Sequence, residues 1–328
     1  MKKLLASAFF IASIMNMLSA KSISFRTDDY TGTVSYNEKA KQGEAIFARM
    51  NMRISRYAKR RNSSEVKAVL QLYKDNQKLD SAQFYFLNSK TRRQTTPDML
   101  AGIPVSFNLE PGNDFSLKIV FLTGIQNDNA KEIILPFNIE NAIFSSFEQD
   151  IGTSDIEKST FMTPDRLTQA EKLSCILKTI NPFSVYGTKP FSEPLREPEK
   201  IASCGDRIFY EKETQKQNYK ILSGNEYDSK EGTEVFACAE GKVALAEFRI
   251  DTGWSVVIEH LPGLYSTYLH LSSVNVKPAS SVRQGEKIGL SGSTGLSARP
   301  RLKWEVWLNN APVQPEFFMK DFLFSSTE

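Results

Sequence analysis

The chain has few of the residues that hold transition metals: 2 His and 3 Cys among 328 residues. The two histidines, His260 and His270, are too far apart in sequence for the short motifs HxH and HExxH, which the chain therefore lacks. Three cysteines are too few for a disulfide framework. One bridge between Cys204 and Cys238 and three free thiols, with Cys175, both remain open.

A strong charge bias is absent as well. The formal net charge is +3, and removal of Lys2 and Lys3 with the first segment lowers it to +1. This excess is too small to favour nucleic acid or an anionic membrane as a partner. After residue 20 no apolar run reaches the roughly 20 residues that a bilayer-spanning helix needs, so we expect no transmembrane segment in the mature chain.

Residues 1–20, MKKLLASAFFIASIMNMLSA, are typical of a secretory signal peptide. Two lysines precede an apolar run from Leu4 to Leu18, and Ser19-Ala20 supplies small residues for cleavage. The run is shorter than a membrane-spanning helix. We therefore predict export, with cleavage after Ala20, to the periplasm or the extracellular side of the cell envelope.

Residues 21–145 alternate apolar and polar side chains, the period of half-buried strands. Met50 and Met52 alternate with Asn51, and a Pro111-Gly112 turn separates two further runs. Several short strands with polar turns predict a β-sandwich of immunoglobulin-like size. One basic hairpin is a solvated surface or a contact for an anionic partner; its cations are Arg49, Arg53, Arg56, Lys59, Arg60 and Arg61.

Residues 146–199 form a predicted linker with one helix at 164–180. Thr163-Pro164-Asp165 is a helix start, since Thr caps, Pro suits the first turn and Asp favours the dipole. Asn181-Pro182 ends the helix. Its predicted role is packing between domains through one apolar stripe: Leu167, Ala170, Leu173, Leu177 and Ile180.

Residues 200–320 return to the strand period, and 321–328 form a tail. The overall prediction is a mostly β protein: an N-terminal β-sandwich, a linking helix and a C-terminal all-β domain. In segment 301–308 the period places two sets of side chains on opposite faces. One face carries Leu302, Trp304, Val306 and Leu308; the other carries Arg301, Lys303, Glu305 and Trp307.

Several blocks in this domain occur in a recognisable order. They read GTEV at 232–235, GKV at 241–243, GLYSTYLHL at 263–271, VRQGEKIG at 282–289, GSTG at 292–295 and NAPVQP at 310–315. Each block is weak alone, but their order and spacing resemble the lysostaphin/LytM-type zinc metallopeptidases, which cleave peptidoglycan. The resemblance implies the family's all-β fold for residues 200–320.

The resemblance also implies where a zinc site would lie. The family's ligand motif HxGxD falls on Leu222 to Glu226, and its HLHFE motif falls on Arg301 to Glu305. Of the five positions that hold or assist the metal, namely Leu222, Glu226, His270, Arg301 and Lys303, only His270 keeps the family residue. A catalytic zinc needs about three protein ligands. We therefore expect no metal and no cofactor, and a vestigial His270. A rebuilt site from Glu226, His270 and Cys238 is the open alternative.

In place of the metal we expect an ion pair between Lys303 and Glu226, with the Lys303 ammonium in the cation's region. The chain is then an exported pseudoenzyme that binds peptidoglycan or regulates a cell-wall hydrolase. Family members without metal ligands include activators of cell-wall amidases, which makes this an expectation by resemblance. The alternatives are an active metalloendopeptidase with an altered metal site and a purely structural envelope domain.

Overall fold

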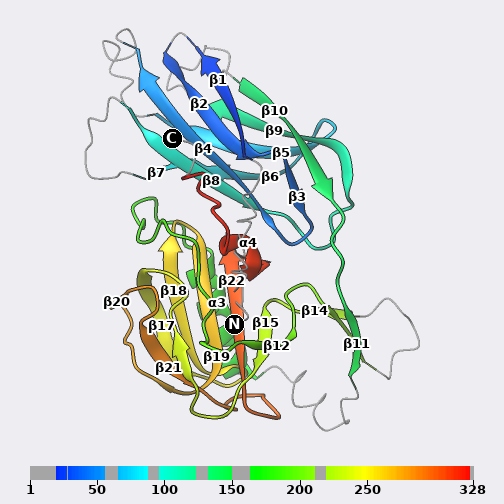
Figure 1. Cartoon of the computed structure of the whole chain (residues 1–328), viewed down its shortest axis with the longest axis vertical. Helices are drawn as coiled ribbons and strands as arrows, with labels where there is room; N and C mark the ends of the chain where they lie inside the picture. Colours follow the sequence, from blue (N-terminus) through cyan, green and yellow to red (C-terminus); the bar gives the residue numbers. More distant parts are fainter. Residues whose placement is uncertain are drawn as a thin grey trace, which may run out of the picture.

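The computed structural model describes residues 20–27, 29–55, 66–87, 96–122, 132–149, 163–210 and 219–325. Most of the elements are strands, so the prediction of a mostly β protein is confirmed (Figure 1). The predicted signal peptide lies outside these ranges apart from Ala20. So do Arg56, Lys59, Arg60 and Arg61 of the predicted basic hairpin.

The N-terminal region packs two sheets face to face (Figure 1). The first has the order β1 (Ala20–Arg26), β2 (Tyr30–Asn37), β4 (Ala45–Ile54), β8 (Asp98–Pro104), β7 (Tyr85–Phe86). The second has the order β3 (Lys39–Lys41), β10 (Glu132–Glu140), β9 (Gly112–Phe121), β5 (Ala68–Lys74), β6 (Gln77–Gln83). Alternation along the strands buries one face of each sheet, as Met50 and Met52 on β4 illustrate.

The C-terminal domain is built on one large antiparallel sheet. Its main path is β12 (Glu199–Ala202), β15 (Asn225–Asp228), β22 (Arg301–Leu308), β19 (Leu264–Val274), β18 (Gly253–Leu261), β17 (Gly241–Arg249), β20 (Ser281–Val282). Beside this path β16 (Glu234–Phe236) pairs with β21 (Lys287–Ser291), and β23 (Ala311–Val313) pairs with β22. β22 is therefore a central strand, held by β15 on one side and β19 on the other.

A small sheet flanks this domain. It consists of β11 (Ser146–Gln149), β13 (Arg207–Tyr210) and β14 (Tyr219–Ile221). β11 falls at the start of the segment predicted as a linker and pairs in parallel with β13. The segment between the domains thus contributes a strand to the C-terminal half, which its polar sequence does not reveal.

Helix α3 (Pro164–Leu177) begins where the sequence predicts, because the Thr163 side chain accepts a hydrogen bond from the Arg166 amide. It ends at Leu177 rather than at residue 180. The predicted apolar stripe is only partly buried, since Leu167 and Ile180 are 45% and 54% exposed. In the described ranges no helix is long and apolar enough to cross a membrane.

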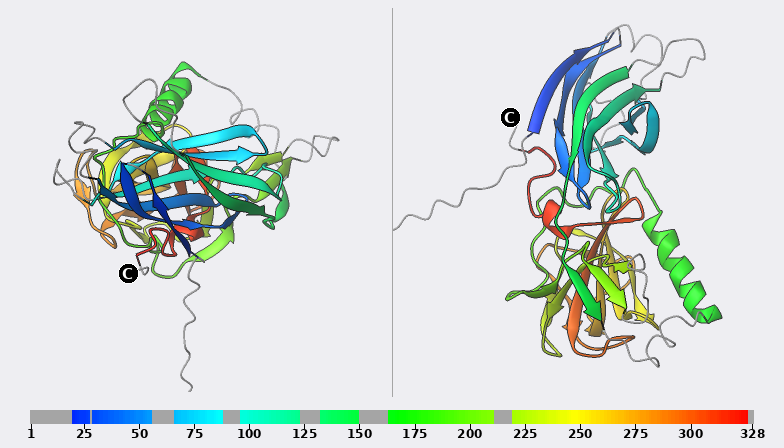
Figure 2. Two further views of the ribbon diagram at one scale, coloured as in Figure 1. Left: turned by 90° about the horizontal axis from the view of Figure 1, so that it is seen from above. Right: turned by 90° about the vertical axis from the view of Figure 1, so that its right-hand side faces the viewer.

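The helix packs against the C-terminal sheet, not between the domains as the sequence suggested (Figure 2). Leu177 lies in a small apolar cluster with Leu245, Val257 and Tyr265. Tyr265 Oη also donates to the Thr179 carbonyl at 2.8 Å. The helix has few apolar side chains, so it covers part of one sheet face instead of filling a domain interface.

The predicted tail is a buried connection between the two domains. After α4 (Pro315–Phe318), the chain buries Phe322, Leu323 and Phe324. The Phe322 ring lies 5.0 Å from that of Phe47 on β4, measured between ring centroids. Arg49 of the predicted basic hairpin pairs with Asp98 and donates to the Leu323 carbonyl, so it is a structural residue.

We predict that Phe322→Ala destabilises the whole chain, because it removes an aromatic ring from the core shared by both domains. The expected loss is about 3–5 kcal/mol in the free energy of unfolding by guanidinium. Phe183→Ala is the control: Phe183 is 77% exposed, and its truncation should change the free energy by less than about 0.5 kcal/mol. Equal effects of the two substitutions would contradict the buried tail.

Candidate functional site

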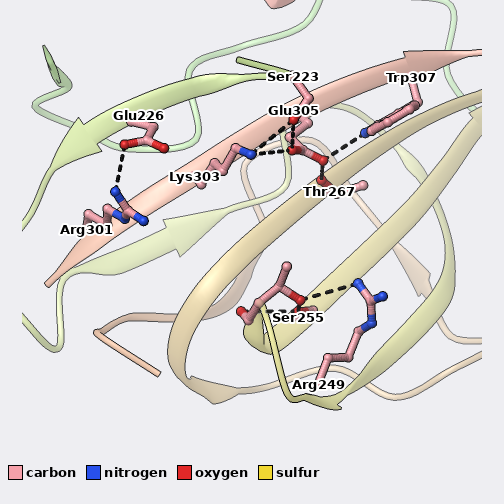
Figure 3. Close-up of polar contacts among 10 residues, drawn as sticks. Ser223, Glu226, Arg249, Ser255, Thr267, Arg301, Lys303, Glu305 and Trp307 are labelled. Carbon is pink, nitrogen blue, oxygen red and sulfur yellow. Dashed lines mark hydrogen bonds and ion pairs between the residues drawn. The ribbon is translucent and has the colours of Figure 1, made fainter. Parts of the chain in front are cut away.

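The candidate site lies on one face of β22. As predicted, alternate residues separate, and Leu302, Trp304, Val306 and Leu308 are buried in the domain core. The opposite side, here called the site face, carries Arg301, Lys303, Glu305 and Trp307 (Figure 3). Strand register places Glu226 of β15 opposite Lys303, and Thr267 of β19 opposite Glu305. The sheet thus brings Glu226, Arg301 and Lys303 together, as predicted.

Arg301 and Glu226 form one ion pair of the site. Arg301 Nη1 lies 2.8 Å from Glu226 Oε2, and both side chains are largely buried. Arg301 stands opposite Asp228, so it reaches Glu226 diagonally across the strand pair. The predicted partner of Glu226 was Lys303, which stands directly opposite. That expectation was wrong about the partner.

Lys303 instead pairs with Glu305 on its own strand. Lys303 Nζ is 2.9 Å from Glu305 Oε1 and 3.0 Å from Ser223 Oγ. Ser223 donates to Glu305 at 2.5 Å, while Thr267 and the Trp307 indole donate to the other carboxylate oxygen at 3.0 and 2.8 Å (Figure 3). Glu305 is 4% exposed. A buried carboxylate with this many donors outcompetes Glu226 for the ammonium.

The protonation states follow from these contacts. Burial alone would raise the pKa of Glu305, but the Lys303 charge and the hydrogen bonds of Lys303, Ser223 and Trp307 lower it to about 2. Burial alone would lower the pKa of Lys303, yet Glu305 outweighs it and the pKa is raised. Both groups are charged at neutral pH. Although Ser223 contacts a lysine, that lysine is an ammonium ion and does not act as a general base for a serine nucleophile.

His270 lies at the edge of the site on β19. Its Nδ1 is 3.0 Å from the Thr294 carbonyl, so Nδ1 carries the proton and donates. Burial lowers its pKa to about 4, and the charges of Arg301 and Lys303 add to that shift. His270 has a backbone φ of +64°, in the left-handed region, and its amide donates to Thr252. It is therefore a neutral imidazole fixed by backbone contacts.

The turn before β15 carries Leu222 close to β22. Leu222 is buried, and its amide donates to the Asp206 carbonyl. At Gly224 a Cβ would lie 2.4 Å from the Trp304 carbonyl oxygen, so only glycine allows this approach. The close contact sets Ser223 within reach of Lys303 and Glu305.

Sequence reasoning missed three residues of the site: Ser223, Thr267 and the ion-pair role of Glu305. A signal was present, because the period of residues 301–308 already placed Lys303 and Glu305 two positions apart on one face. Ser223 and Thr267 carry no comparable signal, since their contacts depend on strand register. All three cysteines are free, and Cys204 and Cys238 are buried.

The comparisons with known proteins assign a family to this domain. The model of Peptidase family M23 matches residues 220–315, which contain β22 and both of its neighbours. This segment is a peptidase family M23 domain. The LytM-type resemblance is thereby confirmed.

Similar proteins share this M23 segment only. The DD-carboxypeptidase/endopeptidase Mpg of Neisseria meningitidis is 36% identical over 97 residues, or 30% of this chain and 22% of Mpg. The murein hydrolase activator EnvC of Escherichia coli is 42% identical over 86 residues, or 26% of this chain and 20% of EnvC. The structure of lysostaphin from Staphylococcus simulans is 24% identical and covers 43% of this chain and 57% of its own, with a TM-score of 0.34. The chain thus spans about a fifth of each curated relative.

The residues at the M23 positions do not fit a zinc ion. Leu222 has no lone pair, Glu226 is committed to Arg301, and Lys303 holds a proton through Glu305. Zinc requires lone pairs from about three protein ligands, and an ammonium repels the cation. Within the described ranges no three His, Cys, Asp or Glu side chains gather as a metal site would require.

A double-mutant cycle measures the coupling of Lys303 and Glu305. We predict that Lys303→Met and Glu305→Gln each cost about 3–5 kcal/mol in the free energy of unfolding, because each leaves the other charge buried and unpaired. The double variant should cost clearly less than the sum.

The matched control is the exposed pair of Lys200 and Glu316, whose side chains are 37% and 40% exposed. Lys200→Met should cost less than about 1 kcal/mol. Strict additivity of the Lys303 and Glu305 substitutions would show that the two residues are not paired.

Proposed function

We propose that this chain is an exported cell-envelope protein whose M23 domain does not hydrolyse peptidoglycan. In this proposal the domain binds peptidoglycan or regulates a cell-wall hydrolase. The chain's first twenty residues support export, because they have the pattern of a signal peptide. Localisation is then the periplasm or the extracellular side of the envelope.

The Lys303–Glu305 ion pair is the observation that carries the proposal. An M23 peptidase of LytM type needs an imidazole at this position of β22, and here an ammonium ion is held 2.9 Å from a buried carboxylate. A fixed positive charge opposes metal binding without adding a nucleophile or a base. The sheet and its neighbours are kept, which favours a role that depends on shape and charge.

The relatives support a cell-wall setting. One bears the name murein hydrolase activator, and another the name DD-carboxypeptidase/endopeptidase. Both names concern the cell wall, and they divide between regulation and hydrolysis. The residues of the present site favour the first kind of role.

A purely structural role is a second candidate, and α3 favours it. The helix packs against Tyr265, which stands opposite Trp307 on the site face. Part of this face is therefore covered by the chain itself. A structural domain predicts no binding to peptidoglycan, so one binding measurement separates the two candidates.

We predict that purified mature protein, dialysed against zinc and then washed, retains far less than one zinc ion per chain by elemental analysis. It should release no soluble fragments from dye-labelled peptidoglycan, with or without a chelator, because no ligand set holds the metal. About one zinc ion per chain, together with hydrolysis that a chelator abolishes, would establish the alternative of an active metalloendopeptidase.

A pelleting experiment with insoluble peptidoglycan tests binding. The mature chain should sediment with the polymer, and Arg301→Ala should weaken this by about tenfold in dissociation constant if the Arg301 guanidinium contacts the polymer. Lys277→Ala, at an exposed lysine of another loop, is the matched control.

A second arm measures how fast a purified cell-wall hydrolase digests the same peptidoglycan with and without the protein. Binding or a changed rate supports the proposal. Neither effect would leave the structural role as the function.

A further inference from the structure

Three cations and two carboxylates gather around the site face, so one positive charge is left over. Arg301 pairs with Glu226, and Lys303 pairs with Glu305. The third cation is Lys220 on β14, beside the turn that carries Ser223. Within the described part of the chain its ammonium has no hydrogen bond and no ion pair.

Arg301 has donors to spare. A guanidinium offers five N–H groups, and the structure gives Arg301 one side-chain acceptor, Glu226 Oε2. Its Nε atom is buried and has no hydrogen-bond partner. A buried N–H without an acceptor is costly, so an acceptor from a ligand would stabilise this arrangement.

The excess charge is felt at two separate positions. Burial lowers the pKa of Lys220, and the charge of Lys303 adds to this, with a smaller contribution from Arg301. The same two cations lower the pKa of His270 on β19. Mutual repulsion of cations on β14, β22 and β19 therefore marks a positive potential that a bound anion would relieve.

His270 adds an acceptor to these donors. Because its Nδ1 donates to Thr294, the neutral ring keeps a lone pair on Nε2. Nε2 has no hydrogen-bond partner among the described residues. A ligand that combines an anion with a neighbouring N–H donor matches this set of groups, and a peptide carboxylate next to its amide has both.

We propose that the site face binds a carboxylate group of a peptide through Arg301 and Lys220, with His270 accepting an amide N–H. This rests on the proposed function in that the site binds without cleaving. The carboxylate comes from a free peptide C-terminus or from an acidic side chain. Planar guanidinium donors suit a carboxylate, and the adjacent ammonium adds charge.

Isothermal titration of the mature chain at pH 7 tests the ligand chemistry. The probes are N-acetyl-Ala-Ala with a free carboxylate, its C-terminal amide, and a doubly blocked peptide with one Glu side chain. We expect at least one carboxylate probe to bind about tenfold more tightly than the amide. The tighter of the two carboxylate probes identifies the source. Equal affinity of all three probes would overturn the proposal.

Substitutions locate the site. Lys220→Gln should weaken carboxylate binding about five- to tenfold without unfolding the chain, because Lys220 is exposed and unpaired. Lys277→Gln, at another exposed lysine, should leave affinity unchanged. Equal affinities of the Lys220→Gln variant and the wild type would also overturn the proposal.

The two histidines give an independent readout. On addition of the carboxylate probe, the NMR signal of His270 Cε1–H should move, while that of His260 stays. His260 is fully buried and bonded to Glu240 and Ser266. If peptidoglycan pelleting persists but neither carboxylate probe binds, the carboxylate proposal fails and the proposed function stands. If neither assay detects binding, both fail.

Discussion

The buried ion pair between Lys303 and Glu305 is the interaction on which the site depends. Glu305 accepts hydrogen bonds from Ser223, Thr267 and Trp307 in addition to Lys303. These donors come from β22, from β19 and from the turn before β15. One carboxylate therefore ties together three segments that are distant in sequence. Removing two charges from water is costly, and this set of contacts offsets the cost.

A fixed ammonium changes what the M23 layout is able to do. Where a zinc ion would polarise a carbonyl and activate water, Lys303 supplies positive charge alone. The second ion pair, Arg301 with Glu226, removes the remaining carboxylate from metal binding. What remains is an electropositive face with spare N–H donors, a chemistry suited to holding an anionic or carbonyl group without attacking it.

Much of this architecture is readable from the sequence, because a period of two residues predicts strands and their buried faces. It correctly separated Arg301 and Lys303 from Leu302, and Thr163 correctly marked the helix start. The partner of Lys303 was not predictable from position alone. Glu226 stands opposite in the register, but burial and the donors around Glu305 decide the pairing.

The other differences also arise from tertiary contacts. Leu167 and Ile180 fit an apolar helix stripe, yet the sheet face under α3 is too small to bury them. Residues after 320 look like a tail, whereas the aromatic core between the domains takes up Phe322. Neither property depends on local sequence, so neither has a local signal.

The most direct test of this account is the protonation state of Lys303. In lysine-selective nitrogen-15 NMR at neutral pH, the Lys303 Nζ signal should be that of an ammonium ion, and an excess of zinc should leave it unchanged. A neutral amine, or a signal that zinc displaces, would contradict the claim that a fixed charge stands in place of the metal.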